Sequence, residues 1–291
     1  MVSSEFNIRP ANPSDHQALL ALTGFEFYVH RHLDWKSPLD WLGSQPFFVL
    51  ENDQRILAAL ACPEDPPTVA WIHLFATNSS IKPQVAFPTL FSIVFEYLQK
   101  NNRIEWIPVI SLQTWLTVLL RENGFQHFQD IVVLEYEPSP QNSPPGEELD
   151  IAQLREMTMS DINRVADVDR QAFHPIWQNT SEVMHEALNQ GAYCMVAIRD
   201  AQIVGYQIST SSVYNAHLAR LAVLPEYQRC GIGSVLIRDL VRHFYDQGVF
   251  RLTVNTQNDN KSSLNLYQKM GFQFTGDSYP VFIYPTALMN C

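Results

Sequence analysis

The residues best suited to chemistry lie in one segment, Leu221–Ser234, which reads Leu-Ala-Val-Leu-Pro-Glu-Tyr-Gln-Arg-Cys-Gly-Ile-Gly-Ser. An apolar strand is expected to end at Val223, and an amphipathic helix to begin after the two glycines. A helix N-terminus presents unpaired amides and partial positive charge, so it suits phosphate groups. Gly231 and Gly233 lack a Cβ where a pyrophosphate must approach closely, and Arg229 would add donors. The segment predicts a pyrophosphate cradle, with a tight strand-to-helix turn as the alternative.

A second informative segment lies downstream. Asn260–Phe272 reads Asn-Lys-Ser-Ser-Leu-Asn-Leu-Tyr-Gln-Lys-Met-Gly-Phe. Gln228–Gly233 resembles the Q/R-x-x-G-x-G/A pyrophosphate loop of the GNAT acetyltransferases, and Asn260–Phe272 resembles that family's N…LY-x-x-x-GF signature. The resemblance covers roughly residues 154–279, with both motifs in the family order and about the usual distance apart. A dinucleotide-binding Rossmann loop is not favoured, because no G-x-G-x-x-G follows a strand.

The resemblance implies an acetyl-CoA-dependent N-acyltransferase and assigns residues to its site. It implies that the strand before the loop splays from its neighbour and offers backbone groups to pantetheine. Tyr267 matches the tyrosine that often protonates the departing CoA thiolate, a step that requires an acid. Packing of a helix against the sheet is the alternative role for this side chain. The implied cofactor-binding positions are Leu221, Ala222, Val223, Gln228, Arg229, Cys230, Gly231, Ile232, Gly233, Ser234, Asn260 and Tyr267.

His217 is the candidate general base. It lies on the strand before Leu221, matching a place where some family members carry a glutamate. An imidazole titrating near neutrality can accept the amine proton directly or through water. A hydrogen-bonded structural histidine is the alternative, and many family members need no dedicated base. Glu226 is interpreted as a surface carboxylate, and no covalent role is expected for Cys230, since the family transfers the acyl group directly.

The acceptor pocket is less well marked. Five side chains are candidates for its lining, with ordinary core packing as the alternative: Phe173, His174, Trp177, Tyr214 and Tyr284. No metal site is predicted, because histidines and acidic residues never cluster at ligand spacing.

The second half has an α/β order of elements. Ser160 is predicted to cap its first helix. Strands are expected at 153–157, 193–198, 203–208, 218–223, 252–254 and from Phe272, the second and third forming a hairpin, with helices after Ser160, from Ser181 to near Gly191, at 234–245 and at 261–270.

The first half repeats this order in outline. Strands are expected at 6–8, 47–50, 56–61, 69–75, 106–110 and 131–136, with helices at 15–22, 87–98 and 115–121. Leu120–Gln126 aligns with Tyr267–Gln273, each placing a glycine after a helix and before a strand-starting Phe. This half has no glycine pair after its central strand, and Leu120 stands where Tyr267 stands. We expect an internal duplication with a degenerate first copy that completes the fold and walls the acceptor cleft.

The two halves are separated by a proline-rich stretch, residues 138–148, which can form neither helix nor central strand. The predicted organisation is a degenerate GNAT-like domain at 1–137, a linker at 138–148 and a catalytic GNAT domain at 149–291. The predicted fold class is α/β (α+β), with two tandem GNAT-like domains. Each is expected to have a mixed, mostly antiparallel twisted sheet flanked by helices.

Composition narrows the classes of partner. The chain has 291 residues, 46% of them hydrophobic, and 19 basic against 30 acidic residues give a net charge of −11. This balance disfavours nucleic-acid binding, since such proteins need a basic surface. No apolar run is long enough to span a membrane, no secretory signal opens the chain, and the four cysteines are scattered. A cytoplasmic protein is expected.

The leading functional hypothesis is transfer of an acetyl group from acetyl-CoA to a primary amine by direct attack in a ternary complex. The acceptor is a small molecule or a peptide N-terminus. A noncatalytic acyl-CoA sensor is the alternative from another class. A further hypothesis is that the first half directs the enzyme to a protein partner.

Overall fold

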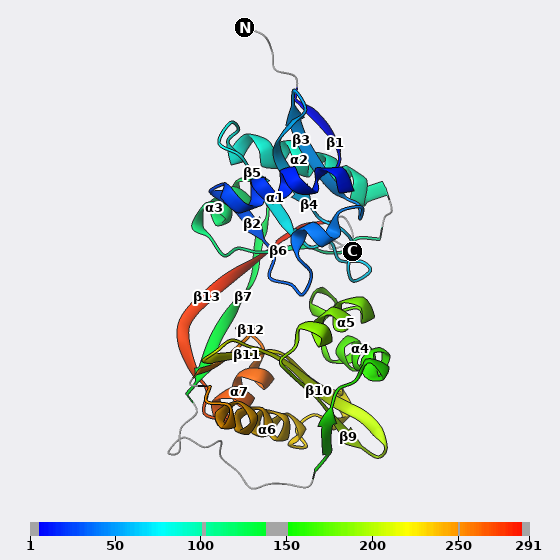
Figure 1. The fold of residues 1–291 in the computed structure, drawn as a ribbon, viewed down its shortest axis with the longest axis vertical. Helices are drawn as coiled ribbons and strands as arrows, with labels where there is room; N and C mark the ends of the chain where they lie inside the picture. Colours follow the sequence, from blue (N-terminus) through cyan, green and yellow to red (C-terminus); the bar gives the residue numbers. More distant parts are fainter. Residues whose placement is uncertain (1–5, 101–102, 138–150, 250, 287–291) are drawn as a thin grey trace. The chain divides into compact units, whose positions relative to one another are not determined.

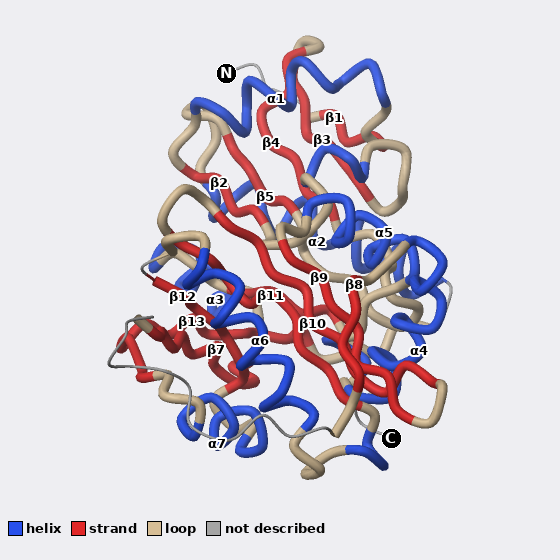
Figure 2. The backbone as a smooth tube through the Cα atoms, turned by 60° about the horizontal axis from the view of Figure 1, so that its bottom comes forward, coloured by secondary structure: helices blue, strands red, loops and turns tan. Residues whose placement is uncertain are grey.

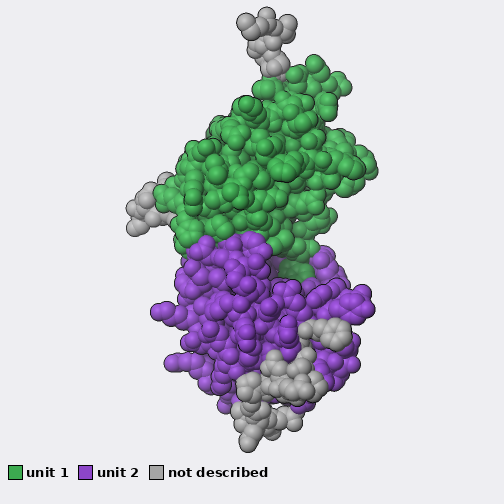
Figure 3. Space-filling model, turned by 90° about the vertical axis from the view of Figure 1, so that its left-hand side faces the viewer, with its two compact units in different colours: residues 1–128, 280–291 green, residues 129–279 purple. Residues whose placement is uncertain are grey.

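A computed structural model describes residues 6–100, 103–137, 151–249 and 251–286. The chain forms two compact units, which Figure 3 colours separately. Unit 1 comprises Met1–Phe128 with Pro280–Cys291, and unit 2 comprises Gln129–Tyr279. Among the described residues, no helix is both long enough and apolar enough to cross a membrane. The predicted linker at 138–148 lies outside the described residues.

Unit 2 contains the predicted hairpin and mixed, mostly antiparallel sheet. Its elements are β7 (Gln126–Tyr136, from Gln129 on), β8 (Gln153–Glu156), α4 (Ile162–Ala172), α5 (Ser181–Gln190), β9 (Tyr193–Arg199), β10 (Gln202–Ser211), β11 (Asn215–Val223), α6 (Ile232–Asp246), β12 (Arg251–Gln257), α7 (Lys261–Lys269) and the start of β13 (Gln273–Tyr284). In the order β7-β12-β11-β10-β9-β8, every neighbouring pair is antiparallel except β11 with β12. Figure 2 shows β9, β10 and β11 side by side. The prediction that Ser160 caps the first helix is wrong, because a 3-10 turn capped by Thr158 precedes α4.

Unit 1 repeats this plan with one additional strand and, among the described residues, one α-helix fewer. Its elements are β1 (Asn7–Pro10), α1 (His16–Phe25), β2 (Tyr28–Arg31), β3 (Phe47–Asn52), β4 (Arg55–Ala61), β5 (Leu74–Thr77), α2 (Pro83–Lys100), β6 (Ile107–Ile110) and α3 (Thr114–Glu122). One sheet has the order β1-β3-β4-β5-β2. The strand predicted at 69–75 forms only from Leu74, and β2 was not predicted, because it is short and lacks a clear apolar alternation.

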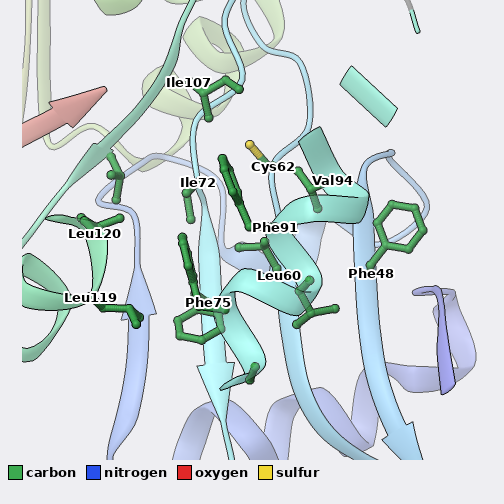
Figure 4. Packing of buried hydrophobic residues seen from close by; sticks show 14 of the residues in the cluster. Phe48, Leu60, Cys62, Ile72, Phe75, Phe91, Val94, Ile107, Leu119 and Leu120 are labelled. Carbon is green, nitrogen blue, oxygen red and sulfur yellow. The ribbon is translucent and has the colours of Figure 1, made fainter. Parts of the chain in front are cut away.

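The core of unit 1 forms around α2. Apolar residues of α2 recur at helical spacing, so that Phe87, Phe91 and Val94 share its buried face. Figure 4 shows Phe91 and Val94 beside Phe75 of β5 in this cluster. Phe282 of β13, from the far end of the chain, belongs to the same cluster.

Both halves begin with the same ion-paired turn. Arg9 of β1 donates two hydrogen bonds to Asp15, at 2.7 and 2.8 Å. Arg155 of β8 donates two to Asp161, each at 2.7 Å. Each aspartate is the last residue of a short 3-10 turn, and its carboxylate also accepts the backbone N–H of the residue that caps this turn. This repeated Arg–Asp spacing supports the internal duplication.

The last strand of each half pairs outside its own half. Residues 131–136 of β7 pair with β12 in unit 2, and residues 281–284 of β13 pair with β6 in unit 1. Figure 1 shows β7 and β13 as two long neighbouring strands, in agreement with their adjacency in the sheet. The compact units therefore have different bounds from the predicted 1–137 and 149–291, because both strands contribute to both units.

Candidate active site

An unpaired strand edge opens in the centre of the unit 2 sheet. β11 pairs in parallel with β12 from Asn215 to Leu218, and the pairing then stops although both strands continue. A bulge at Ala219 coincides with this point, where the register of β10 and β11 shifts. Beyond it β12 stays paired with β7, while Ala219–Val223 faces no strand among the described residues on that side. We call this edge of Ala219–Val223 the open edge.

Two residues direct backbone groups to the open edge. The amide of Leu224 donates to Val204 of β10, so the carbonyl of Val223, on the opposite side of that peptide, points away from β10. Leu221 lies two residues earlier and has the same orientation. Ala222 lies opposite Tyr206 and directs its backbone groups to β10 instead. The carbonyl of Val223 accepts a hydrogen bond of 3.0 Å from the Gln228 side chain.

The open edge leads into the glycine loop at the N-terminus of α6. Arg229 and Gly231 have φ angles of 61° and 91°, in the left-handed region, and Gly231 is the N-cap. A Cβ on Gly231 would lie 2.7 Å from the Ile151 side chain, and one on Gly233 would lie 2.9 Å from Leu266 of α7. The glycines therefore serve both backbone shape and close packing, and the first amides of α6 have no intrahelical acceptor.

Tyr267 is the buried residue of α7, with 5% of its surface exposed. Its ring packs near Phe272, 5.8 Å between centroids. Burial raises the pKa of the Tyr267 phenol above its ordinary value of 10.0, and the charge of Arg220 partly opposes this shift. The hydroxyl therefore keeps its proton at neutral pH, as a proton donor must.

Asn260 caps α7. Its side-chain oxygen accepts the backbone N–H of Ser263 at 3.1 Å, and its side-chain amide donates to Gln257 of β12 at 3.3 Å. The structure thus assigns Asn260 a capping role at the end of the strand that diverges from β11.

His217 lies on β11 immediately before the pairing with β12 ends. Its Nδ1 is 2.9 Å from the hydroxyl of Thr253, which itself donates to the carbonyl of Ala216 at 3.4 Å. The Thr253 hydroxyl thus connects the imidazole to the backbone of β11. Burial lowers the pKa of His217 below 6.5. The side chain is therefore neutral at pH 7 and able to accept a proton.

The remaining predicted side chains fall into different environments. Glu226 and Cys230 are exposed, and the Cys230 thiol is free. Tyr284 packs against Phe91 and Phe125 in the core of unit 1. Tyr214 is exposed in the turn before β11.

A buried charged cluster, not predicted from the sequence, lies beside the bulge. Arg220 of β11 donates from Nε and Nη2 to Asp169 of α4, at 2.8 and 2.9 Å. The hydroxyl of Tyr206 on β10 donates to the same carboxylate. A signal was present in the sequence, since Asp169 occupies the apolar face of α4 and Arg220 interrupts an apolar strand.

Comparison with known proteins identifies the part of the chain that carries this geometry. Residues 162–272, which include the open edge, the glycine loop and Tyr267, match the model of the Acetyltransferase (GNAT) family. These residues form a GNAT acetyltransferase domain. The family generally uses acetyl-CoA, and the chain is an N-acetyltransferase.

Relatives of the GNAT domain are also acetyltransferases. The [ribosomal protein bS18]-alanine N-acetyltransferase of Haemophilus influenzae is 26% identical over 119 residues, 41% of this chain and 80% of the relative. Human N-alpha-acetyltransferase 30 is 27% identical over 143 residues, 46% of this chain and 38% of the relative. A tandem GNAT protein from the clavulanic acid biosynthesis pathway covers 97% of this chain and 98% of its own, with a TM-score of 0.64 at 13% identity. The tandem GNAT fold thus extends over both halves.

Unit 1 differs from the GNAT domain at the equivalent edge. In unit 1, residues 69–72 before β5 pair in parallel with residues 106–108 at the start of β6. The backbone N–H groups of Ala70 and Ile72 donate to the carbonyls of Trp106 and Pro108. β5 then continues, but here β2 pairs with it from Leu74 to Thr77 on the edge opposite β4. The side chain of His30 also bonds the Ile72 carbonyl at 3.0 Å. The edge that is open in the GNAT domain is therefore occupied by the chain's own strand.

A cavity in the same half of the chain as the GNAT domain lies away from the open edge. A cavity of about 390 Å³ on α4 and α5 is lined by Met159, Ile162, Asn163, Ser181, Glu182, His185 and Glu186. None of these is a predicted cofactor or catalytic residue. Within the described ranges, no group of three or more His, Cys, Asp or Glu side chains is arranged to hold a metal ion.

Proposed function

We propose that the chain transfers the acetyl group of acetyl-CoA to the α-amine of a peptide N-terminus. The open edge of β11 leading into the left-handed glycine loop carries this proposal. The edge offers backbone groups of Leu221 and Val223 to the amides of pantetheine, as an added strand would use them. The amides of Arg229–Ser234 suit the pyrophosphate. The names of the relatives from Haemophilus influenzae and human support a peptide acceptor.

The chemistry follows from this arrangement. The neutral amine attacks the thioester carbonyl, the C–N bond forms, and collapse of the tetrahedral intermediate breaks the C–S bond. The departing thiolate takes the proton of the Tyr267 phenol. The imidazole of His217, two residues before the open edge on the side away from the loop, accepts the proton of the amine directly or through water. A peptide α-amine has a pKa near 8, so about a tenth of it is neutral at pH 7 and about half at pH 8.

The glycine loop gives a direct test of acetyl-CoA binding. Gly231→Ala is expected to weaken binding about 10-fold or more, because its Cβ adds left-handed strain and a collision with Ile151 that shifts the loop. The control is Gly248→Ala after α6, which adds similar strain (φ 77°) but meets nothing within 4 Å. Titration calorimetry of acetyl-CoA into both variants makes the comparison. Equal weakening by both, or no binding to the wild type, would contradict the proposed site.

The acceptor class is tested by an acetylation assay with peptides and small amines. Peptides that differ in their first residue, N-terminally blocked peptides containing lysine, and simple diamines are incubated with acetyl-CoA, and products are identified by mass spectrometry. Acetylation of free N-termini alone supports the proposal. Acetylation of the small amines alone would assign the enzyme to small-molecule acceptors instead.

Unit 1 is not expected to bind acetyl-CoA. Because β2 occupies the edge of β5 that a pantetheine arm would use, we expect one acetyl-CoA per chain in the same titration. A second binding event in the wild type, whose affinity is unchanged in Gly231→Ala, would contradict this expectation.

A further inference from the structure

The carboxylate of Asp169 is the fully buried centre of a polar cluster in unit 2. No part of the residue is exposed, and neither is any part of Tyr206. The carboxylate accepts the two guanidinium bonds of Arg220, the Tyr206 hydroxyl and the backbone N–H of Asn179 at 2.8 Å. These donors come from β11, from β10 and from the segment between α4 and α5. Asp169 therefore joins three parts of the unit at one point.

Arg220 extends the same cluster along the α4–α5 segment. Its guanidinium lies 3.7 Å from the ring centroid of Phe173, and it also donates to the carbonyl of Trp177. Together with the bond from Asn179 to Asp169, these contacts hold both ends of the segment 173–179. The segment is thereby fixed to β11 through one side chain.

The place of Arg220 along β11 gives this attachment a consequence for catalysis. Arg220 directly follows the bulge residue Ala219, so it marks the end of the open edge farthest from the glycine loop. A ligand whose pyrophosphate sits at the loop and whose arm follows the edge brings its reactive end toward this residue.

Burying an ion pair costs desolvation free energy, and apolar side chains would hold α4 and β11 together without that cost. The directional bonds of an ion pair, however, fix the position of the groups that it joins. We propose that the Asp169–Arg220 pair positions the 173–179 segment as the acceptor side of the reaction site, and that it thereby sets the affinity for the incoming amine. This inference rests on the proposed transferase function. Asp169 and Arg220 are positioning residues. Acetyl-CoA is bound by the glycine loop and by the backbone of the open edge, and the side-chain pair does not contribute to its affinity.

Asp169→Asn tests the proposal, because the amide keeps the shape but loses the charge and one accepting oxygen. The expected result is a rise of about 10-fold in KM for the peptide acceptor, with the Kd of acetyl-CoA unchanged. Asp167→Asn on the same helix is the matched control, since Asp167 pairs with Arg170 on the exposed surface of α4. Equal changes in acceptor KM and acetyl-CoA Kd, or no change in a folded protein, would overturn the inference.

Hydrogen exchange separates this inference from the proposed function. In Asp169→Asn, exchange is expected to accelerate across 173–179 while the loop at 225–234 keeps the wild-type rate. Unchanged exchange in 173–179 would overturn the inference even where the wild type acetylates peptides. If Asp169→Asn does not fold, Tyr206→Phe is tested instead, because it removes a single donor to the same carboxylate. The acceptor KM and the exchange rate across 173–179 are then expected to rise in the same way. A wild type that acetylates no amine at all would overturn the proposed function, whatever the exchange data show.

Discussion

Replacing Tyr267 with phenylalanine is expected to lower kcat about 100-fold or more, because the departing thiolate loses its proton donor. The ring remains, so packing against Phe272 and the core of unit 2 is kept. The Kd of acetyl-CoA should therefore not change. Steady-state kinetics with a peptide acceptor, together with calorimetry, measure the two quantities separately.

The pH profile adds a second test of the same residue. Because the pKa of Tyr267 is raised above 10.0, the wild type should show no loss of activity from ionisation of this phenol between pH 7 and 9. Tyr245→Phe, an exposed change on α6, is the control and should retain wild-type kinetics. A fall of kcat in both variants, or full activity in Tyr267→Phe, would remove Tyr267 from the reaction.

Acidification is expected to destabilise unit 1 between pH 6.5 and 4. Burial lowers the pKa of His30 to about 4 and that of His73 well below 6.5. In this window the unfolded chain binds more protons than the folded chain, so stability falls as the pH falls. His30 alone accounts for a loss of about 3 kcal/mol across the window, since each unit of pKa shift corresponds to about 1.4 kcal/mol.

Urea unfolding at several pH values, followed by tryptophan fluorescence, measures this loss; Trp41 and Trp71 lie beside His73 and His32 in unit 1. His30→Gln should flatten the pH dependence, whereas His185→Gln, on the exposed surface of α5, should leave it unchanged. An unaltered slope in His30→Gln would contradict the assignment. The ion-paired carboxylates of Asp15 and Asp161, whose pKa values are lowered mainly by their arginine partners, contribute only below this window.

The sequence was most informative where function depends on local backbone shape. Gly231 and the helix that follows it are fixed by neighbouring residues, so the loop was predicted together with the elements around it. The divergence of β11 from β12 followed from the resemblance, and the pairing that ends at Leu218 agrees with it. The cofactor and catalytic roles assigned to the predicted residues remain predictions.

The features that were missed depend on contacts between distant residues. β2 is stabilised by pairing with β5 rather than by its own residues, and the bond from Arg220 to Asp169 joins positions 51 residues apart. The predicted domain bounds followed the proline-rich stretch, but the pairing of β13 with β6 joins residues on opposite sides of it. A pattern read along the chain contains no information on which strand edge a later segment fills.

The pairing of β13 with β6 determines when unit 1 can be completed during synthesis. A ribosome that has translated β1 to β7 has supplied nearly all of unit 1, yet the edge of β6 that receives Val281–Tyr284 is still empty. Phe282, which belongs to the buried cluster of unit 1, and Tyr284, which packs against Phe91 and Phe95 of α2, are also still missing. The nascent unit 1 therefore remains incomplete until β13 has been translated, and a chain that stops between the halves lacks this strand. Completion of unit 1 thus depends on translation of β13, which follows most of unit 2 in the chain.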